Sequence, residues 1–185
     1  MGERAGSPTP VTQTAAGPAV AALRAWPRHA GRPAHWRARP MGSTAREIYE
    51  LQTRAFNDHD IETFAASLDE GVVQVAPGEI IARGRLAVAE FFGSWIEAFP
   101  DAHVEVTAVH EVGDVIIEEG IFRGTQNGVF RTPAGDVPPT GRRVQGDYIQ
   151  VITFRNGRCI AANLMFDRLQ LLEQLGLVPA PATSG

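Results

Sequence analysis

Residues 124–128 read GTQNG, residues 138–144 read PPTGRRV and residues 166–176 read FDRLQLLEQLG, and these three motifs decide how the fold is interpreted. Their order predicts a turn after one strand, a loop rich in Pro and Gly, and a final strand that leads into a short helix. Asp167 stands where that strand ends. It is either a general base at the mouth of an apolar cavity or the N-cap of the helix.

The composition limits the classes of function. A chain of 185 residues that is 44% hydrophobic predicts one globular domain with a sizeable core, and the net charge of −4 argues against nucleic-acid binding. No apolar run is long enough to cross a membrane. The single Cys159 cannot form an internal disulfide, which favours a cytoplasmic location. All 17 basic residues are arginines, and this excludes a Schiff-base lysine.

The chain divides into three parts by composition. Residues 1–43 are rich in Ala, Pro and Arg, carry six arginines and one acidic residue, and are predicted to be a disordered tail. Alternatively, translation starts at Met41, just before the first expected helix. Residues 44–178 form the predicted folded domain, and residues 179–185 are predicted to be a flexible C-terminus.

Hydrophobic periodicity predicts helices first and strands afterwards. The expected helices cover residues 44–57, 60–68, 86–99 and 169–175, and the expected strands cover 72–76, 104–112, 115–125, 144–154 and 159–166. This order is typical of an α+β fold. We expect a strongly bent mixed or antiparallel sheet that wraps around three N-terminal helices as a cone-shaped barrel and leaves a half-open pocket.

Together with FPDAHVEV at residues 99–106, the three motifs resemble the SnoaL-like polyketide cyclase and ester cyclase family of the nuclear-transport-factor-two superfold. The resemblance implies a small-molecule enzyme that works without metal or cofactor on a hydrophobic, polyketide-like substrate. In characterised relatives an Asp removes a proton from a carbon next to a carbonyl, and a ring then closes. The resemblance also implies a homodimer formed through the outer face of the sheet. The same superfold contains ketosteroid isomerases, epoxide hydrolases, dehydratases and proteins without known activity.

This chain departs from the family pattern at several polar positions. Relatives often carry an EHWD-like motif before the retained Asp, where this chain has Ala161, Ala162, Asn163 and Leu164. The His common in a GTH motif is replaced by Gln126. The family's catalytic groups are therefore only partly present.

Asp167 is the expected catalytic base, and burial near Met165 would raise its pKa. Gln150 and Asn163 are expected to orient a substrate carbonyl, unless their strands turn them to the outer surface. Expected substrate-binding residues are Phe56, Trp95, Phe122, Gln126, Tyr148 and Met165, and core packing is the alternative for the four aromatic ones.

Glu118 and Glu119 are adjacent on one predicted strand, so one of them must point toward the helices. The inward carboxyl would be a second acid or would pair with an Arg such as Arg123 or Arg143. The sequence contains no HxxxH or CxxC motif, and we expect no metal site. Two further hypotheses remain open: an epoxide hydrolase or dehydratase built on paired carboxylates, and a ligand-binding protein of the same fold without activity.

Overall fold

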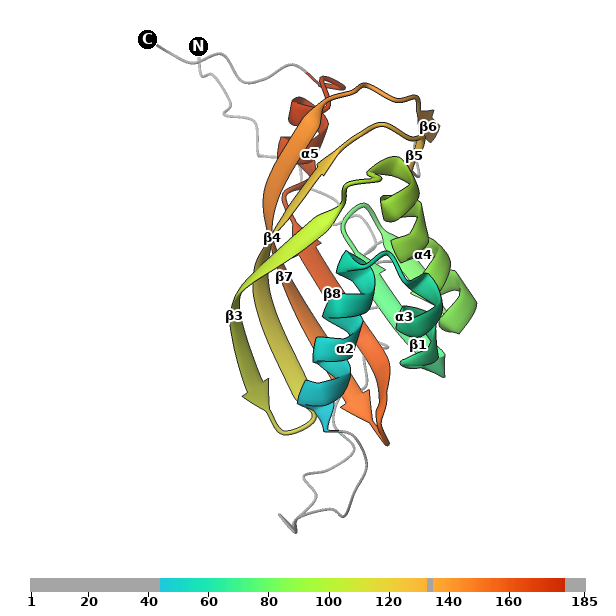
Figure 1. Ribbon diagram of the computed structural model, residues 1–185, viewed down its shortest axis with the longest axis vertical. Coiled ribbons are helices and arrows are strands. Elements are labelled where there is room, and N and C mark those ends of the chain that lie inside the picture. Colours follow the sequence, from blue (N-terminus) through green and yellow to red (C-terminus); the bar gives the residue numbers. More distant parts are fainter. Residues whose placement is uncertain (1–43, 133–134, 179–185) are drawn as a thin grey trace, which may run out of the picture. The chain divides into compact units, whose positions relative to one another are not determined.

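The computed structural model describes residues 44–132 and 135–178, which form an α+β body (Figure 1). The predicted tail (1–43) and C-terminus (179–185) lie outside the described residues. The elements are α2 (Ala45–Asn57), α3 (Ile61–Ala66), β1 (Leu68–Ala76), β2 (Ile80–Arg83), α4 (Arg85–Ala98), β3 (His103–Val112), β4 (Val115–Thr125), β5 (Phe130–Thr132), β6 (Gly135–Val137), β7 (Arg143–Arg155), β8 (Arg158–Phe166) and α5 (Arg168–Gln174).

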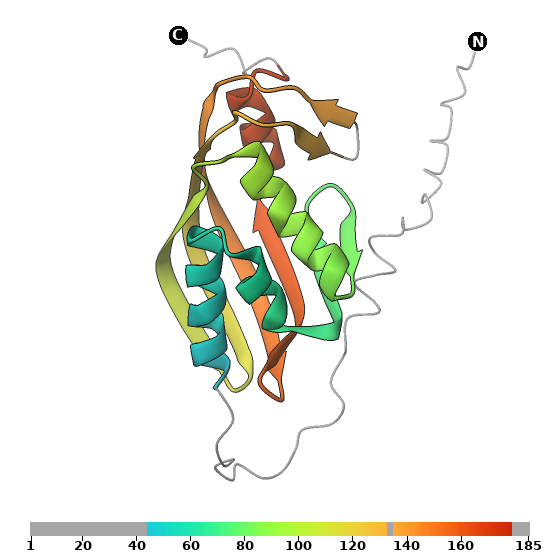
Figure 2. The ribbon, with the colours of Figure 1, turned by 45° about the vertical axis from the view of Figure 1, so that its right-hand side comes forward.

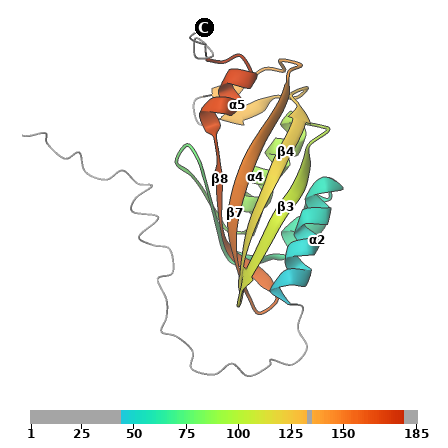
Figure 3. The same cartoon turned by 90° about the vertical axis from the view of Figure 1, so that its left-hand side faces the viewer.

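The main sheet has six strands in the order β2-β1-β8-β7-β4-β3. β1 and β8 are parallel, and every other neighbouring pair is antiparallel. Helices α2, α3 and α4 lie against one face of this curved sheet (Figures 1 and 2), and Figure 3 shows its opposite face. The predicted α+β class and mixed sheet are therefore confirmed. The sheet stays open between its edge strands β2 and β3.

Helix caps fix where the first helices begin. Thr44 and Glu47 form a reciprocal capping box: the Glu47 amide donates to Thr44 Oγ1 at 3.2 Å, and the Thr44 amide donates to Glu47 Oε2 at 2.7 Å. Asp60 caps α3 by accepting from the Thr63 amide at 2.9 Å. These side chains satisfy amide groups that would otherwise lack partners at the helix ends.

The long strands are joined by tight turns. The β7–β8 connection places Asn156 at φ 50° and Gly157 at φ 75°, two successive left-handed residues that suit the twist of a two-residue hairpin. This is the turn that the Asn-Gly pair predicts. The β1–β2 hairpin and the small β5–β6 sheet were not predicted, because strands of three or four residues are too short to show a clear alternation.

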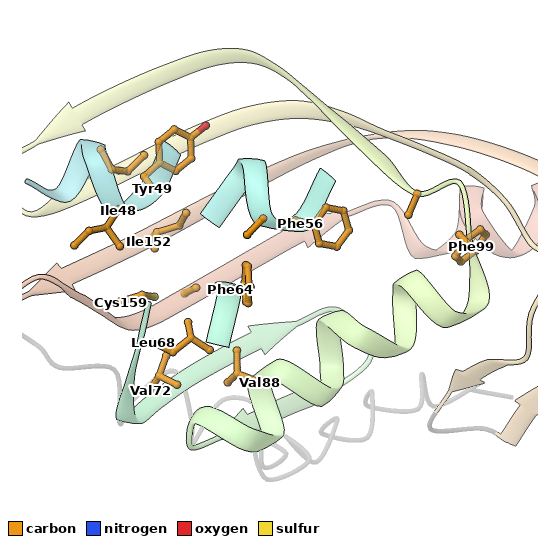
Figure 4. Close-up of a cluster of buried hydrophobic side chains, with 14 of the residues drawn as sticks. Ile48, Tyr49, Phe56, Phe64, Leu68, Val72, Val88, Phe99, Ile152 and Cys159 are labelled. Carbon is orange, nitrogen blue, oxygen red and sulfur yellow. The ribbon is translucent and has the colours of Figure 1, made fainter. Parts of the chain in front are cut away.

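The core lies between the helices and the concave face of the sheet (Figure 4). Phe99, Leu68, Ile116 and Leu175 are its largest fully buried apolar side chains. At the edge of the cluster, Tyr49 presents its ring to the core. Among the described residues, no helix is long and apolar enough to cross a membrane.

Candidate active site

A cavity of about 120 Å³ opens between the helices and the inner face of the sheet. Its apolar wall consists mainly of aromatic rings: Phe56, Phe64, Phe92, Trp95, Phe122 and Phe166. Trp95 is central to this wall, with ring centroids 5.3 Å from Phe122 and 5.6 Å from Phe166. An enclosed aromatic space with a few polar groups is the usual form of a small-molecule site.

Strand alternation explains which side chains reach the cavity. Alternate residues of a strand point to opposite faces, and the β4–β7–β8 register aligns Glu118 with Gln150 and Gln150 with Leu164. All three line the cavity. Phe122 on β4 and Tyr148 on β7 share this inward phase and also line it.

Glu118 is the buried acid of the cavity. Its side chain lies on the inner face of β4, and the residue is only 5% exposed. Burial raises the pKa of its carboxyl above the ordinary value, while the neighbouring hydroxyls of Tyr49 and Tyr148 oppose that rise. The two adjacent glutamates in the sequence do not by themselves show whether Glu118 or Glu119 faces inward. The shared alternation of Glu118 and Phe122 was the signal that could have decided it.

The expected pairing of the inward glutamate with an arginine does not occur. Arg123 pairs with Glu105 at 2.5 Å on the outer surface. Glu119 also faces outward, with its Oε1 3.7 Å from His110 Nε2. No arginine or histidine is among the residues that line the cavity, so Glu118 has no cationic neighbour there.

Tyr49 and Tyr148 stand next to Glu118 from opposite walls, one on α2 and the other on β7. Their hydroxyl oxygens are buried and have no hydrogen-bond partner of normal geometry among the described residues. Burial raises the pKa of both phenols, and the nearby Glu118 charge adds to the rise. Tyr49 is a lining residue that the sequence reasoning missed.

Asp167 is a helix cap and also lies where a catalytic base was expected. It is the N-cap of α5, and its Oδ1 accepts from the Gln170 amide at 3.0 Å. It also lines the cavity. The residue is exposed rather than buried, so the expected burial beside Met165 is wrong: the helix start holds Asp167 at the solvent end of the cavity.

The predicted amide pair is separated by the sheet. Gln150 lines the cavity, but Asn163 does not, because Leu164 and Phe166 are the inward residues of β8. Met165 has the same phase as Asn163 and is 58% exposed on the outer face. The expectation that Asn163 and Met165 reach the substrate therefore has no support in their placement.

Gln126 is completely buried away from the cavity, where it holds a loop in place. Its Nε2 donates to the carbonyls of Gly128, Val137 and Pro138 at 3.1–3.2 Å. Its Oε1 accepts from the amide and the hydroxyl of Thr140. This residue was expected to bind substrate, but its amide is fully used within the protein.

The remaining expected wall residues, Phe56, Trp95, Phe122 and Tyr148, all line the cavity. His59 does not line the cavity; its Nε2 lies 2.9 Å from the Ala102 carbonyl oxygen. Within residues 44–132 and 135–178, no cluster of three His, Cys, Asp or Glu side chains is placed to hold a metal ion.

Comparison with solved structures identifies the same fold in several bacterial proteins. A proposed SnoaL-like polyketide cyclase from Jannaschia sp. CCS1 is 19% identical with a TM-score of 0.65, and the match covers 78% of this chain and 100% of that one. IdmH of Streptomyces antibioticus, a proposed polyketide cyclase, is 24% identical with a TM-score of 0.60 over 72% and 99% of the two chains. An LEH-like epoxide hydrolase of M. tuberculosis is 18% identical, with a TM-score of 0.56 over 72% and 90%.

The sequence itself has no significant match among curated proteins. The model of the SnoaL-like polyketide cyclase family, however, matches residues 46–175, which is most of the chain and nearly all of its described part. The fold shared with the solved structures agrees with that match. The chain belongs to the SnoaL-like polyketide cyclase family.

Proposed function

We propose that this protein is a small-molecule enzyme of the cyclase type, which removes a proton from a carbon next to a carbonyl and then directs ring closure or a related lyase or isomerase step. The observation that carries the proposal is the position of Asp167, an exposed carboxylate at the end of an otherwise aromatic cavity. An apolar ligand held by the rings would present its solvent-side carbon to this base.

The proposed chemistry is balanced without a cofactor. Asp167 accepts the proton, and the electron pair of the broken C–H bond moves to the carbonyl as an enolate. The enolate carbon attacks a second carbonyl of the same molecule, whose oxygen then takes up a proton. Gln150, which lines the same cavity, is the proposed amide donor to a substrate oxygen. Polyketide-like esters carry both carbonyls and fit the aromatic wall.

Because Asp167 also caps α5, its capping role and its proposed catalytic role can be tested separately. Asn caps a helix as well as Asp does, so Asp167→Asn should keep the stability of α5, whereas Asp167→Ala should lose about 1 kcal/mol. We expect Asp167→Asn to slow deuterium incorporation at the α-carbon of ethyl benzoylacetate by at least about 100-fold, measured by NMR above the uncatalysed rate. Asp136→Asn, on the exposed strand β6, is the matched control. Exchange at the wild-type rate in Asp167→Asn would refute the assignment.

A second enzyme reaction has one observation in its favour: among the carboxyls that line the cavity, Glu118 is buried and Asp167 is exposed. An epoxide hydrolase or dehydratase uses paired carboxylates as acid and base. With styrene oxide as probe in ¹⁸O-labelled water, that activity gives a labelled diol faster than the uncatalysed reaction, and Asp167→Asn removes the acceleration. Cyclisation introduces no solvent oxygen.

A ligand-binding protein without activity is the remaining hypothesis. It would be supported by ligand-induced thermal stabilisation that is equal in wild type and Asp167→Asn, together with no turnover in either assay. The homodimer that the resemblance implies also stays a prediction. The outer sheet face carries the exposed apolar residues Ile149 and Met165, and light scattering in solution would test it.

A further inference from the structure

We propose that Tyr49, Glu118 and Tyr148 form a hydrogen-bond-donating site that binds an uncharged oxygen of the ligand within the cavity. Three elements bring these residues together: α2, β4 and β7. All three line the cavity, and they are 3%, 5% and 7% exposed. The inference deepens the proposed function because it names the group that orients the substrate, but its test below measures binding alone.

The first argument is that two hydroxyls of this cluster lie beside the Glu118 carboxyl but make no hydrogen bond of normal geometry within the part of the chain that the structure describes. Among the described residues, three buried side-chain polar atoms have no hydrogen-bond partner: Tyr49 Oη, Tyr148 Oη and Gln74 Oε1. Two of these three therefore lie on either side of Glu118. A buried hydroxyl without a partner carries a free-energy penalty, which a ligand oxygen would remove.

Two neighbouring polar side chains of the cavity wall, Gln52 and Thr53, are already paired. Gln52 Nε2 donates to Ser67 Oγ at 2.8 Å, and that hydroxyl donates to the Phe64 carbonyl. Thr53 Oγ1 donates to the Tyr49 carbonyl at 3.1 Å. The contrast indicates that the tyrosine hydroxyls are available as donors, in addition to the Gln150 amide.

The second argument concerns charge. The lining residues include three carboxyls, those of Glu118, Asp147 and Asp167, and no arginine or histidine. A carboxylate or phosphate on the ligand would have no counter-charge in this cavity. Since burial also makes Glu118 retain its proton to higher pH, the cluster acts as a set of donors toward a neutral acceptor such as a ketone or an ester.

The third argument is that the position of Tyr148 is fixed by the neighbouring strand. Gly120 on β4 pairs directly with Tyr148 on β7. The Tyr148 ring lies over the glycine so closely that a Cβ there would be 2.6 Å from Oη. The absence of a side chain at Gly120 thus leaves the space in which the phenol stands beside Glu118.

The test compares two probes of similar shape, acetophenone and isopropylbenzene, of which only the first has a carbonyl oxygen. Their dissociation constants are measured by NMR chemical-shift titration. We expect the preference for acetophenone over isopropylbenzene to fall about tenfold in the Tyr49→Phe/Tyr148→Phe protein, and about threefold in each single variant. Using the ratio of the two constants cancels general changes in cavity shape. An unchanged ratio in the folded double variant, or in both single variants, would overturn the proposal.

Two further probes test the charge argument. Benzoate should bind at least about tenfold more weakly than acetophenone, because its charge has no partner. Benzyltrimethylammonium tests the opposite arrangement, in which an ionised Glu118 binds a cation among aromatic rings. Tighter binding of this cation than of acetophenone, lost in Glu118→Gln, would contradict a neutral-oxygen site, as would benzoate binding equal to that of acetophenone.

Glu118→Gln is the conservative variant for the cluster, since its amide is uncharged and still donates hydrogen bonds. We expect the acetophenone constant to change by less than about threefold in this variant. Asp167→Asn should leave the acetophenone-to-isopropylbenzene ratio unchanged. If Asp167 proves not to be the catalytic base, the test of the oxygen site is therefore unaffected.

Discussion

Gly120→Ala tests the contact between β4 and Tyr148 on which the oxygen site depends. A Cβ at Gly120 would lie 2.6 Å from Tyr148 Oη and 2.7 Å from its Cε1 and Cζ, whereas ordinary contact begins at 3.4 Å. The ring must therefore retreat by about 0.8 Å in a closely packed wall. Such overpacking costs about 1–3 kcal/mol, and replacing a strand glycine returns about 0.5–1 kcal/mol.

We expect a net loss of about 1–2 kcal/mol in the free energy of unfolding, measured by urea denaturation followed by circular dichroism. A double-mutant cycle with Tyr148→Leu identifies the cause. Without the ring, Gly120→Ala should be neutral or stabilising, which gives a coupling energy of about 1 kcal/mol or more. The shifted ring should also lower the preference for acetophenone.

Gly71→Ala is the matched control, because it also lies in a strand and its Cβ would find only Asp69 Oδ1, at an ordinary 3.5 Å. The free energy of unfolding of the Gly71→Ala protein should not be lower than that of wild type. If Gly120→Ala unfolds at the wild-type urea concentration, or costs as much in the Tyr148→Leu background as in wild type, the ring does not occupy the space over Gly120.

Two other substitutions test the electrostatics and the loop. Because the pKa of Glu118 is raised in the folded state, its contribution to stability is greatest below its unfolded pKa of about 4.3 and is lost as pH rises through the folded pKa. Glu118→Gln does not titrate, so its unfolding free energy should gain on that of wild type as pH rises above about 4, and a constant difference would contradict the raised pKa. Gln126→Ala leaves several buried groups of the 137–140 loop unpaired and should cost about 3 kcal/mol, with faster amide hydrogen exchange at Gly141, whose amide donates to the Gln126 carbonyl. A loss below about 1 kcal/mol would show that water replaces the glutamine.

The long elements could be predicted because their periodicity is strong. Residues 115–125 were expected as a strand and form β4 with the same bounds. The helix expected over residues 86–99 is α4, Arg85–Ala98. In both cases a turn glycine or a terminating proline lies next to an apolar repeat, so that local and tertiary preferences agree.

The face of β8 could not be read in the same way. Ala161 and Ala162 are both buried although they point to opposite faces, so the middle of β8 lacks the alternation that the exposed Met165 shows farther along the strand. Alternation distinguishes faces only where one of them meets solvent. For this reason Asn163 was placed in the cavity although Leu164 occupies that side.

Tyr49 was missed for a different reason. The apolar spacing of Ile48, Leu51 and Ala55 indicates one helix face, but the buried face also includes Tyr49, Gln52 and Phe56, and Leu51 is 37% exposed. Gln52 looks like a surface residue in the sequence, and only its hydrogen bond to Ser67 makes its burial favourable. Polar residues that are satisfied by distant partners are hidden from periodicity.

The aromatic contacts of Trp95 give the protein an optical reporter. The chain has three tryptophans, and Trp95 is the one within the described residues, with its indole 5.1–5.7 Å from four phenylalanine rings. It also lines the cavity, so a bound carbonyl compound near the indole can quench its emission. With Trp26 and Trp36 replaced by Phe, the fluorescence of one side chain would follow ligand entry in real time, before any substrate is known.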